Sequence, residues 1–277
     1  MTMRNHHLEG RFQSSAGEIV YGAEGTGPDV VLVHGTPTSS LIWRGVIERL
    51  SSQYRLHYLD LPGYGASAKF EGQEVRLRSF ARVLREWLDH LKLQRPHLVG
   101  HDFGGATVLG AHLVEQVPAA SIVVADGVVL NPWGTPYSLH VRNYESVFSK
   151  VPGYIHRATL AAHLATAVSR PLPVELEDWL LKPWTGEIGQ RAYYRQVAQY
   201  DHGYTARLEP LYHTIAVPTL VLWGEEDRWV HIETAHRLRK LIPAAQLETL
   251  PDAGHFSMLD CPGLFARLLY DWLASRE

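Results

Sequence analysis

At residues 97–105 a strand runs straight into a helix through glycines, and this segment constrains the fold more than any other. It reads HLVGHDFGG. The apolar residues before Gly100 suit a buried strand, and the apolar spacing after Gly104 suits a helix. Small residues at these two positions let the backbone turn sharply. We therefore expect Asp102 to stand clear of the sheet, with the helix N-terminus aimed at it.

Short β-branched runs alternate with helical stretches on both sides of this turn, which predicts βαβ units and a mostly parallel central sheet flanked by helices, an α/β fold. The predicted strands are Asp29–Val33, Leu56–Asp60, His97–Gly100, Ile122–Ala125, Thr219–Trp223 and Gln246–Leu250, after a leading hairpin over Glu9–Gly22. The predicted helices are Leu41–Leu50, Val75–Leu91, Gly104–Gln116, Ile232–Leu241 and a last one from Pro262 to Trp272.

The alternation breaks at Asn131, where prolines punctuate a stretch rich in Trp and Tyr that has no clear strand. Regular alternation returns after Thr214. This break predicts a helical cap over residues 131–213, inserted into one core made of residues 1–130 and 214–277. A core of this size is consistent with a chain that is 45% hydrophobic and 20% charged.

Charge and cysteine content narrow the classes of partner. The net charge is −3 and the sequence pI is about 6.6, so no excess of basic residues favours nucleic acid or an anionic membrane. Cysteine occurs once, at Cys261, and the N-terminus lacks the apolar run of a secretory signal, so we expect a cytoplasmic protein. No motif predicts a metal or a cofactor, and a monomer or a homodimer fits equally well.

Four motifs follow one another in an order that resembles the α/β-hydrolase family over nearly the whole chain. His34-Gly35-Thr36-Pro37 is similar to that family's oxyanion turn, and residues 60–65 are similar to its glycine-rich loop. Residues 100–104 resemble the nucleophile elbow, with Asp102 in place of the usual serine, and Gly254-His255-Phe256 resembles the turn of the catalytic histidine. The resemblance implies that Asp102 is the nucleophile and that His255 is the general base.

Two acids compete for the third place in this catalytic group. Asp227 follows a predicted strand at the common family position, whereas Asp126 ends the preceding strand, where some haloalkane dehalogenases carry theirs. We favour Asp227, with Asp126 as the alternative. Its expected role is to hold the tautomer of the His255 imidazole and to stabilise the imidazolium.

An aspartate nucleophile predicts a different reaction from that of a serine. A carboxylate is a poor acyl nucleophile, but it can displace a leaving group from a saturated carbon and form an alkyl-enzyme ester. His255 would then activate the water that hydrolyses this ester. Backbone N–H groups of Thr36 and Phe103 are the expected oxyanion hole of that second step.

The first leaving group considered is a halide. Haloalkane dehalogenases typically hold the halide with a Trp after the nucleophile and a second Trp or Asn, and Phe103 and Thr36 occupy those places here. Because Phe has no N–H donor, Trp133, Trp179 or Trp184 would have to replace it. On the other hand, the segment from Thr36 to Arg44 resembles dehalogenase sequence.

The second leaving group is an epoxide oxygen. Epoxide hydrolases use cap tyrosines as acids, and Ala192-Tyr193-Tyr194-Arg195 resembles a cap segment that carries one. Tyr194 is therefore the first candidate and Tyr144 its possible partner, with Tyr154 and Tyr137 as rivals. Together with Asp102 and His255, the Tyr194 segment leads us to expect an epoxide hydrolase, and the apolar Phe103 suits small apolar or aromatic epoxides. A haloalkane dehalogenase and a non-catalytic ligand-binding member of the fold are the alternatives.

Overall fold

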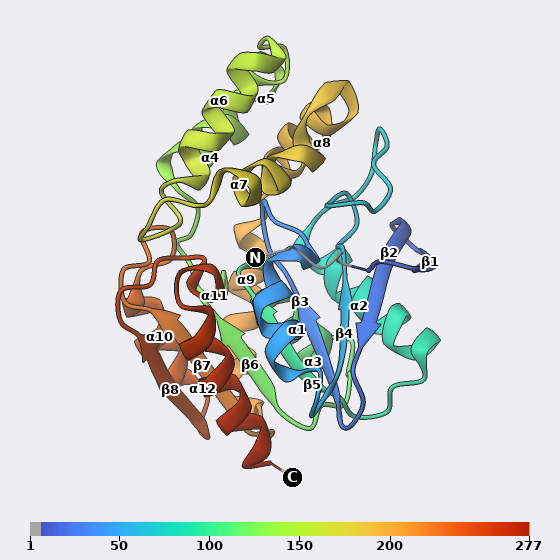
Figure 1. Ribbon diagram of the computed structural model, residues 1–277, viewed down its shortest axis with the longest axis vertical. Coiled ribbons are helices and arrows are strands. Elements are labelled where there is room, and N and C mark those ends of the chain that lie inside the picture. Colours follow the sequence, from blue (N-terminus) through green and yellow to red (C-terminus); the bar gives the residue numbers. More distant parts are fainter. Residues whose placement is uncertain (1–6, 277) are drawn as a thin grey trace.

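An eight-stranded sheet forms the centre of the protein, in the order β1-β2-β4-β3-β5-β6-β7-β8 (Figure 1). The computed structural model describes residues 7–276. β1 and β2 are antiparallel to each other and β2 is antiparallel to β4, whereas all pairs from β4 to β8 are parallel. This confirms the expected α/β fold with its leading hairpin. The strands span Gly10–Ser14 (β1), Gly17–Glu24 (β2), Asp29–Val33 (β3), Arg55–Leu59 (β4), His97–His101 (β5), Ile122–Ala125 (β6), Thr219–Gly224 (β7) and Ala245–Leu250 (β8).

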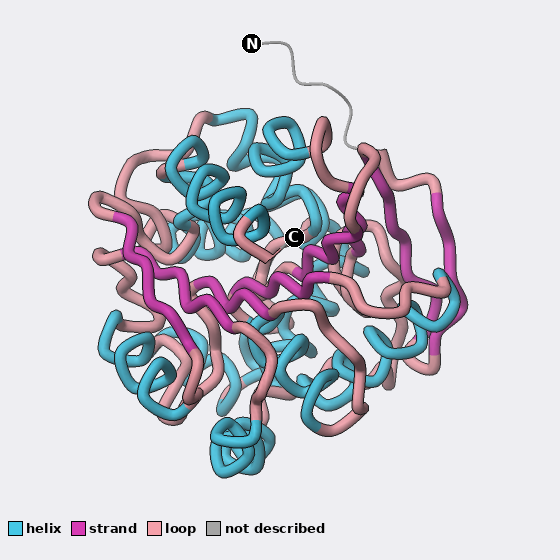
Figure 2. The backbone as a smooth tube through the Cα atoms, turned by 90° about the horizontal axis from the view of Figure 1, so that it is seen from below, coloured by secondary structure: helices cyan, strands magenta, loops and turns pink. Residues whose placement is uncertain are grey.

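Helices lie on both faces of this sheet (Figure 2). α2 (Leu77–Leu91) packs on α3 (Phe103–Leu113), and α1 (Arg44–Leu50) packs on α12 (Pro262–Ala274), while α10 (Ile232–Leu241) contacts β7 and β8. Every residue of β5, β6 and β7 is buried. These central strands are apolar on both sides because both faces are covered, as is usual in parallel sheets.

The predicted helix Leu41–Leu50 is divided in two. A 3-10 turn, η1 (Ser40–Trp43), precedes α1. Ser40 donates from its backbone N and its hydroxyl to Oδ1 of Asp60, at 2.8 and 2.6 Å. These bonds hold the first turn against the loop after β4, and helical spacing alone does not reveal them.

Between β6 and β7 the chain forms helices that rise above the sheet (Figure 1). They are α4 (Pro136–Asn143), α5 (Glu145–Phe148), α6 (Gly153–Leu164), α7 (Val174–Leu181), η2 (Lys182–Trp184) and α8 (Gly186–Ala198). We call them the helical insertion. Treating residues 131–213 as a separate cap domain stays a prediction.

The last part of the predicted cap lies against the core instead. α9 (His202–Leu208) contacts α3, and in η3 (Glu209–Thr214) the Tyr212 hydroxyl donates to the carbonyl of Val129 at 2.7 Å. The prolines show where the strand pattern ends. They do not show whether each short helix packs against the core or within the insertion. Among the described residues, no helix is long and apolar enough to cross a membrane.

Candidate functional site

The turn between β5 and α3 holds Asp102 in a strained backbone conformation. Its φ is 54° and its ψ is −118°, a combination that costs a residue with a side chain about 1–3 kcal/mol. The glycines beside it are required, because a Cβ on Gly104 would lie 2.0 Å from the carbonyl oxygen of Val33, and one on Gly100 would lie 2.2 Å from that of Gly104. The close approach of this turn to β3 therefore fixes Asp102 above the sheet.

The loop after β3 meets the Asp102 carboxylate. The backbone N of Thr36 donates to Asp102 Oδ1 at 2.6 Å. A Cβ on Gly35 would lie 2.1 Å from the same oxygen, so the loop passes directly over the carboxylate. Phe103 is the first residue of α3, and its ring packs against Trp133 and Tyr200 with centroids 5.6 and 5.2 Å away. Both predicted oxyanion residues thus flank Asp102, and their role stays a prediction.

His255 lies between two carboxylates. Its Nδ1 is 2.8 Å from Asp227 Oδ2, and its Nε2 is 3.3 Å from Asp102 Oδ2. The other oxygen of Asp227 accepts hydrogen bonds from the backbone N atoms of Trp229 and Val230, at 2.8 and 2.9 Å. Since both oxygens of Asp227 are bonded, its orientation toward the imidazole is fixed. The structure brings Asp102, His255 and Asp227 together.

Asp126 is buried nearby but bonds elsewhere. Its Oδ1 accepts from the backbone N of Gly224 at 2.7 Å, and its Oδ2 accepts from the hydroxyl of Ser257, the first residue of α11 (Ser257–Asp260). Burial, reinforced by the charge of Asp227, raises the pKa of Asp126 well above its ordinary value. Asp126 therefore joins the ends of β6 and β7 to α11, whereas Asp227 bonds to His255.

The charge state of His255 follows from these neighbours. Burial alone would lower its pKa, but the negative charge of Asp227 and contact with Asp102 outweigh burial and raise the pKa to about 10. A pKa of about 10 predicts that His255 is an imidazolium at neutral pH in the resting site. Converting Asp102 to an ester would remove one of the causes of this raised pKa, so His255 would then release its proton more readily.

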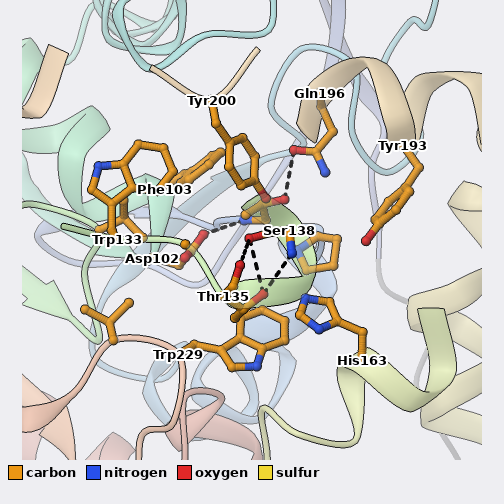
Figure 3. Close-up of a pocket in the computed structure, with 15 residues that line it drawn as sticks. Asp102, Phe103, Trp133, Thr135, Ser138, His163, Tyr193, Gln196, Tyr200 and Trp229 are labelled. Carbon is orange, nitrogen blue, oxygen red and sulfur yellow. Dashed lines mark hydrogen bonds between the residues drawn. The ribbon is translucent and has the colours of Figure 1, made fainter. Parts of the chain in front are cut away.

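A small cavity opens beside Asp102, below the helical insertion, and Figure 3 shows residues that line it. α8 and the residues after it contribute Tyr193, Gln196 and Tyr200, which follow one another at helical spacing, and α6 contributes His163. Within residues 7–276, no group of three or more His, Cys, Asp or Glu residues is placed to hold a metal ion.

Two tyrosines line this cavity, and neither is among the four that the sequence suggested. Tyr193 and Tyr200 are in the wall, and their hydroxyls point into the space that Asp102 faces (Figure 3). Burial raises the pKa of Tyr200 above its ordinary value, and the charge of Asp102 adds to this effect. Both hydroxyls are protonated at neutral pH, because burial also raises the pKa of Tyr193.

The tyrosines suggested by the sequence lie outside the cavity wall. The Tyr194 hydroxyl is 3.0 Å from Nδ1 of His156, inside the helical insertion. Tyr144 and Tyr154 are 53% and 74% exposed, and Tyr137 packs against the ring of His163. Adjacent residues on a helix point about 100° apart, so Tyr193 lines the cavity while Tyr194 does not. The spacing of positions 193, 196 and 200 is the sequence signal that groups them on one side of this segment, but it does not tell which side faces the core.

Of the three tryptophans considered for a halide, Trp133 and Trp184 donate their indole N–H groups elsewhere, and Trp179 lies outside the cavity wall. Trp133 lines the cavity, but its Nε1 donates to Thr205 Oγ1 at 3.0 Å. Trp184 donates to the carbonyl of Pro37 at 2.6 Å. Trp179 lies beneath the guanidinium of Arg44, 5.9 Å from it, and is not in the wall. Trp229, a cavity residue that the sequence did not single out, donates to Thr166 Oγ1 at 2.8 Å.

Comparison with known proteins agrees with this architecture. A family model described as the alpha/beta hydrolase fold matches residues 28–262. The chain belongs to the α/β-hydrolase family. Haloalkane dehalogenase 2 of Mycobacterium tuberculosis is 31% identical over 276 residues, which cover 94% of this chain and 93% of that protein. The chain is thus a hydrolase of the α/β fold with dehalogenase relatives.

Solved structures of this α/β hydrolase's relatives match it over nearly its full length. An alpha/beta hydrolase fold protein from Burkholderia ambifaria has a TM-score of 0.92 at 35% identity, with 96% of this chain and 100% of that chain covered. A mutant of haloalkane dehalogenase DatA from Agrobacterium tumefaciens C58 has a TM-score of 0.80 at 23% identity, covering 95% and 96%. At 23% identity, the likeness to DatA shows a shared fold and nothing more.

Proposed function

We propose that this α/β hydrolase opens an alkyl electrophile by direct attack of the Asp102 carboxylate on a saturated carbon. The attack gives an alkyl-enzyme ester, which water activated by His255 then hydrolyses. Asp227 holds the imidazole, and the N–H groups of Thr36 and Phe103 stabilise the oxyanion of the second step. The observation that carries this proposal is the carboxylate at position 102 with Nε2 of His255 at 3.3 Å.

The protonation of His255 supports this order of steps. While Asp102 is charged, His255 is an imidazolium, with its pKa raised to about 10 against the lowering effect of burial, and it has no basic nitrogen. Esterification would remove the charge of Asp102, and this loss would lower the pKa of His255. The histidine thus becomes a base only after the first step, when a base is required.

An epoxide is the substrate that the cavity wall favours. The hydroxyls of Tyr193 and Tyr200 face the cavity, and a protonated phenol can donate its proton to the ring oxygen as the C–O bond breaks. The wall also carries the rings of Phe103, Trp133 and Trp229. We therefore propose an epoxide hydrolase for small apolar or aromatic epoxides.

Styrene oxide tests this proposal in two ways. The native enzyme should convert it to the diol, and His255→Ala should stop at the ester, which intact mass spectrometry detects as an adduct on Asp102. Asp102→Asn is the matched control, because its amide is not a nucleophile, and it should show no adduct. A native enzyme that turns over no epoxide, together with a His255→Ala variant that carries no adduct from any epoxide tried, would contradict the epoxide proposal.

A haloalkane dehalogenase is the second candidate, favoured by the 31% identity to haloalkane dehalogenase 2 and by the resemblance of residues 36–44. Release of bromide from 1-bromobutane, with the corresponding butyl adduct in His255→Ala, would favour it over the first. If neither epoxides nor alkyl halides leave an adduct, the remaining reading is a ligand-binding protein that uses the fold without its chemistry.

A further inference from the structure

Gln196 carries a buried amide in the cavity wall, and half of that amide is unpaired. Its side-chain Oε1 accepts from the hydroxyl of Tyr64 at 2.7 Å and from Oγ1 of Thr36 at 3.0 Å. Its Nε2 is buried and has no hydrogen-bond partner among the described residues. Figure 3 shows this amide at the edge of the cavity, on the face of α8 that also carries Tyr193. Buried donors are usually paired, so an open one at a cavity indicates a ligand.

The orientation of the amide is set by its neighbours. If oxygen and nitrogen were exchanged, Nε2 would donate to these two hydroxyl oxygens, Oε1 would be the unpaired atom, and both hydroxyl protons would need other acceptors. Tyr64 is fully buried and Thr36 is 5% exposed, so water cannot easily replace that acceptor. In the orientation present, Oε1 pairs with both hydroxyl protons, and Nε2 is the atom of this amide without a partner among the described residues.

The remaining side-chain amide and indole N–H groups of the wall, within residues 7–276, are already used. Trp133 donates to Thr205 and Trp229 donates to Thr166. Gln196 is also tied to the reaction centre, because Thr36, whose hydroxyl it accepts, donates from its backbone N to Asp102 at 2.6 Å. Gln196 and Asp102 also line the same cavity, so a ligand atom that accepts from Nε2 would share that space with the Asp102 carboxylate.

We propose that Gln196 Nε2 donates a hydrogen bond to the leaving atom, which makes it a catalytic residue for the first step. This inference rests on the proposed function. As an Asp102 oxygen forms its bond to carbon, the bond from carbon to the leaving atom breaks, and that atom takes the electron pair. A halide departs as an anion held by Nε2. An epoxide oxygen becomes an alkoxide, which Nε2 stabilises while a tyrosine hydroxyl supplies the proton, because an amide cannot.

The test measures how fast the ester forms, with His255→Ala as the parent so that the adduct persists. Gln196→Met removes the donor at similar size. Gln196→Glu keeps acceptors for Tyr64 and Thr36 but puts an oxygen where the N–H group was. Styrene oxide, 1-chlorobutane and 1-iodobutane are the electrophiles, and the adduct is followed by intact mass spectrometry at several concentrations.

Gln199→Met is the matched control. Gln199 is the next glutamine on this segment, and it binds the backbone of Val75 and Gln73 at 3.0 and 2.9 Å without lining the cavity. Both Gln196 variants should lower the maximal rate of ester formation about 10²-fold, with little change in the half-saturating concentration. With butyl halides the loss of rate should be larger for chloride than for iodide. Chloride is the poorer leaving group, so a hydrogen bond from Nε2 stabilises its departure more.

Two results would overturn the inference. The first is equal slowing by Gln196→Met and Gln199→Met. The second is an equal loss of rate for 1-chlorobutane and 1-iodobutane. Either result would mean that Gln196 only joins the insertion to the core. These outcomes leave the proposed function intact, because the parent still forms the ester. If the His255→Ala parent forms no ester with any electrophile, the proposed function fails and the role of Gln196 fails with it.

Discussion

At the scale of single residues, the two buried acids should differ in their effect on catalysis. Asp227→Asn removes the charge that holds the His255 imidazolium, so ester hydrolysis should slow by about 10²- to 10⁴-fold. Asp126→Asn keeps an oxygen for the backbone N of Gly224 and should change the rate less than about tenfold. Single-turnover kinetics of the second step measures both. A larger loss in Asp126→Asn would make Asp126 the acid partner of the histidine.

The protonation of His255 should also make the free energy of unfolding depend on pH. The folded pKa of His255 is about 10, raised by Asp227 and Asp102 against the effect of burial, and its ordinary value is 6.5. Between these values the folded state holds a proton that the unfolded state has lost, so this contribution is complete below pH 6.5 and disappears as the pH rises through 10.

Urea unfolding at pH 7 and pH 10 measures this effect. The free energy of unfolding of the native protein should fall between the two values, and that of His255→Gln should fall much less. Parallel curves for the two proteins would show that His255 is not an imidazolium in the resting site.

The site residues that the sequence predicted are those whose signal is local. Asp102, His255 and Asp227 each follow a strand, and parallel strands bring their carboxyl ends to one edge of a sheet. Tyr193, Tyr200 and Gln196 could not be assigned in this way. Their position depends on the rotational phase of α8 over the core, and this phase is set by packing between segments far apart in the chain.

At the scale of elements, the turn between β5 and α3 should tolerate no added side chain. In Gly104→Ala the new Cβ would meet the backbone of Val33, which cannot easily move, so the free energy of unfolding should fall by about 1–3 kcal/mol. Gly263, near the start of α12, is the control, since nothing lies within 4 Å of its Cβ position. Gly263→Ala should be neutral or slightly stabilising in chemical denaturation, and equal losses would contradict this account.

Core elements with a clear local pattern were predicted well, whereas the separate helices between β6 and β7 were not. The predicted spans of β6 and α10 coincide with the observed spans Ile122–Ala125 and Ile232–Leu241, because β-branched runs and amphipathic spacing act locally. The helices between β6 and β7 span only three to thirteen residues. Their ends depend on packing against one another and on the core, as the contact of α9 with α3 illustrates.

At the scale of the whole molecule, a few bonds hold the helical insertion against the core. Trp184 donates to the carbonyl of Pro37 at 2.6 Å. Trp184→Phe removes this bond and should cost about 1 kcal/mol, which corresponds to about a fivefold larger open population. Hydrogen exchange of the α8 amides should accelerate by that factor, whereas Tyr154→Phe, at an exposed residue of the insertion, should leave it unchanged. No difference between the two variants would mean that the bond does not restrain opening.

The chemistry of the site is divided between two parts of the chain. Asp102, Asp227 and His255 stand in loops at the edge of the sheet, while Tyr193 and Gln196 lie on one face of a single helix of the insertion. For an evolving enzyme, this division separates two kinds of change. If the proposed mechanism holds, a few substitutions along α8 would exchange the group that departs from carbon, while the residues that hydrolyse the ester would be inherited intact.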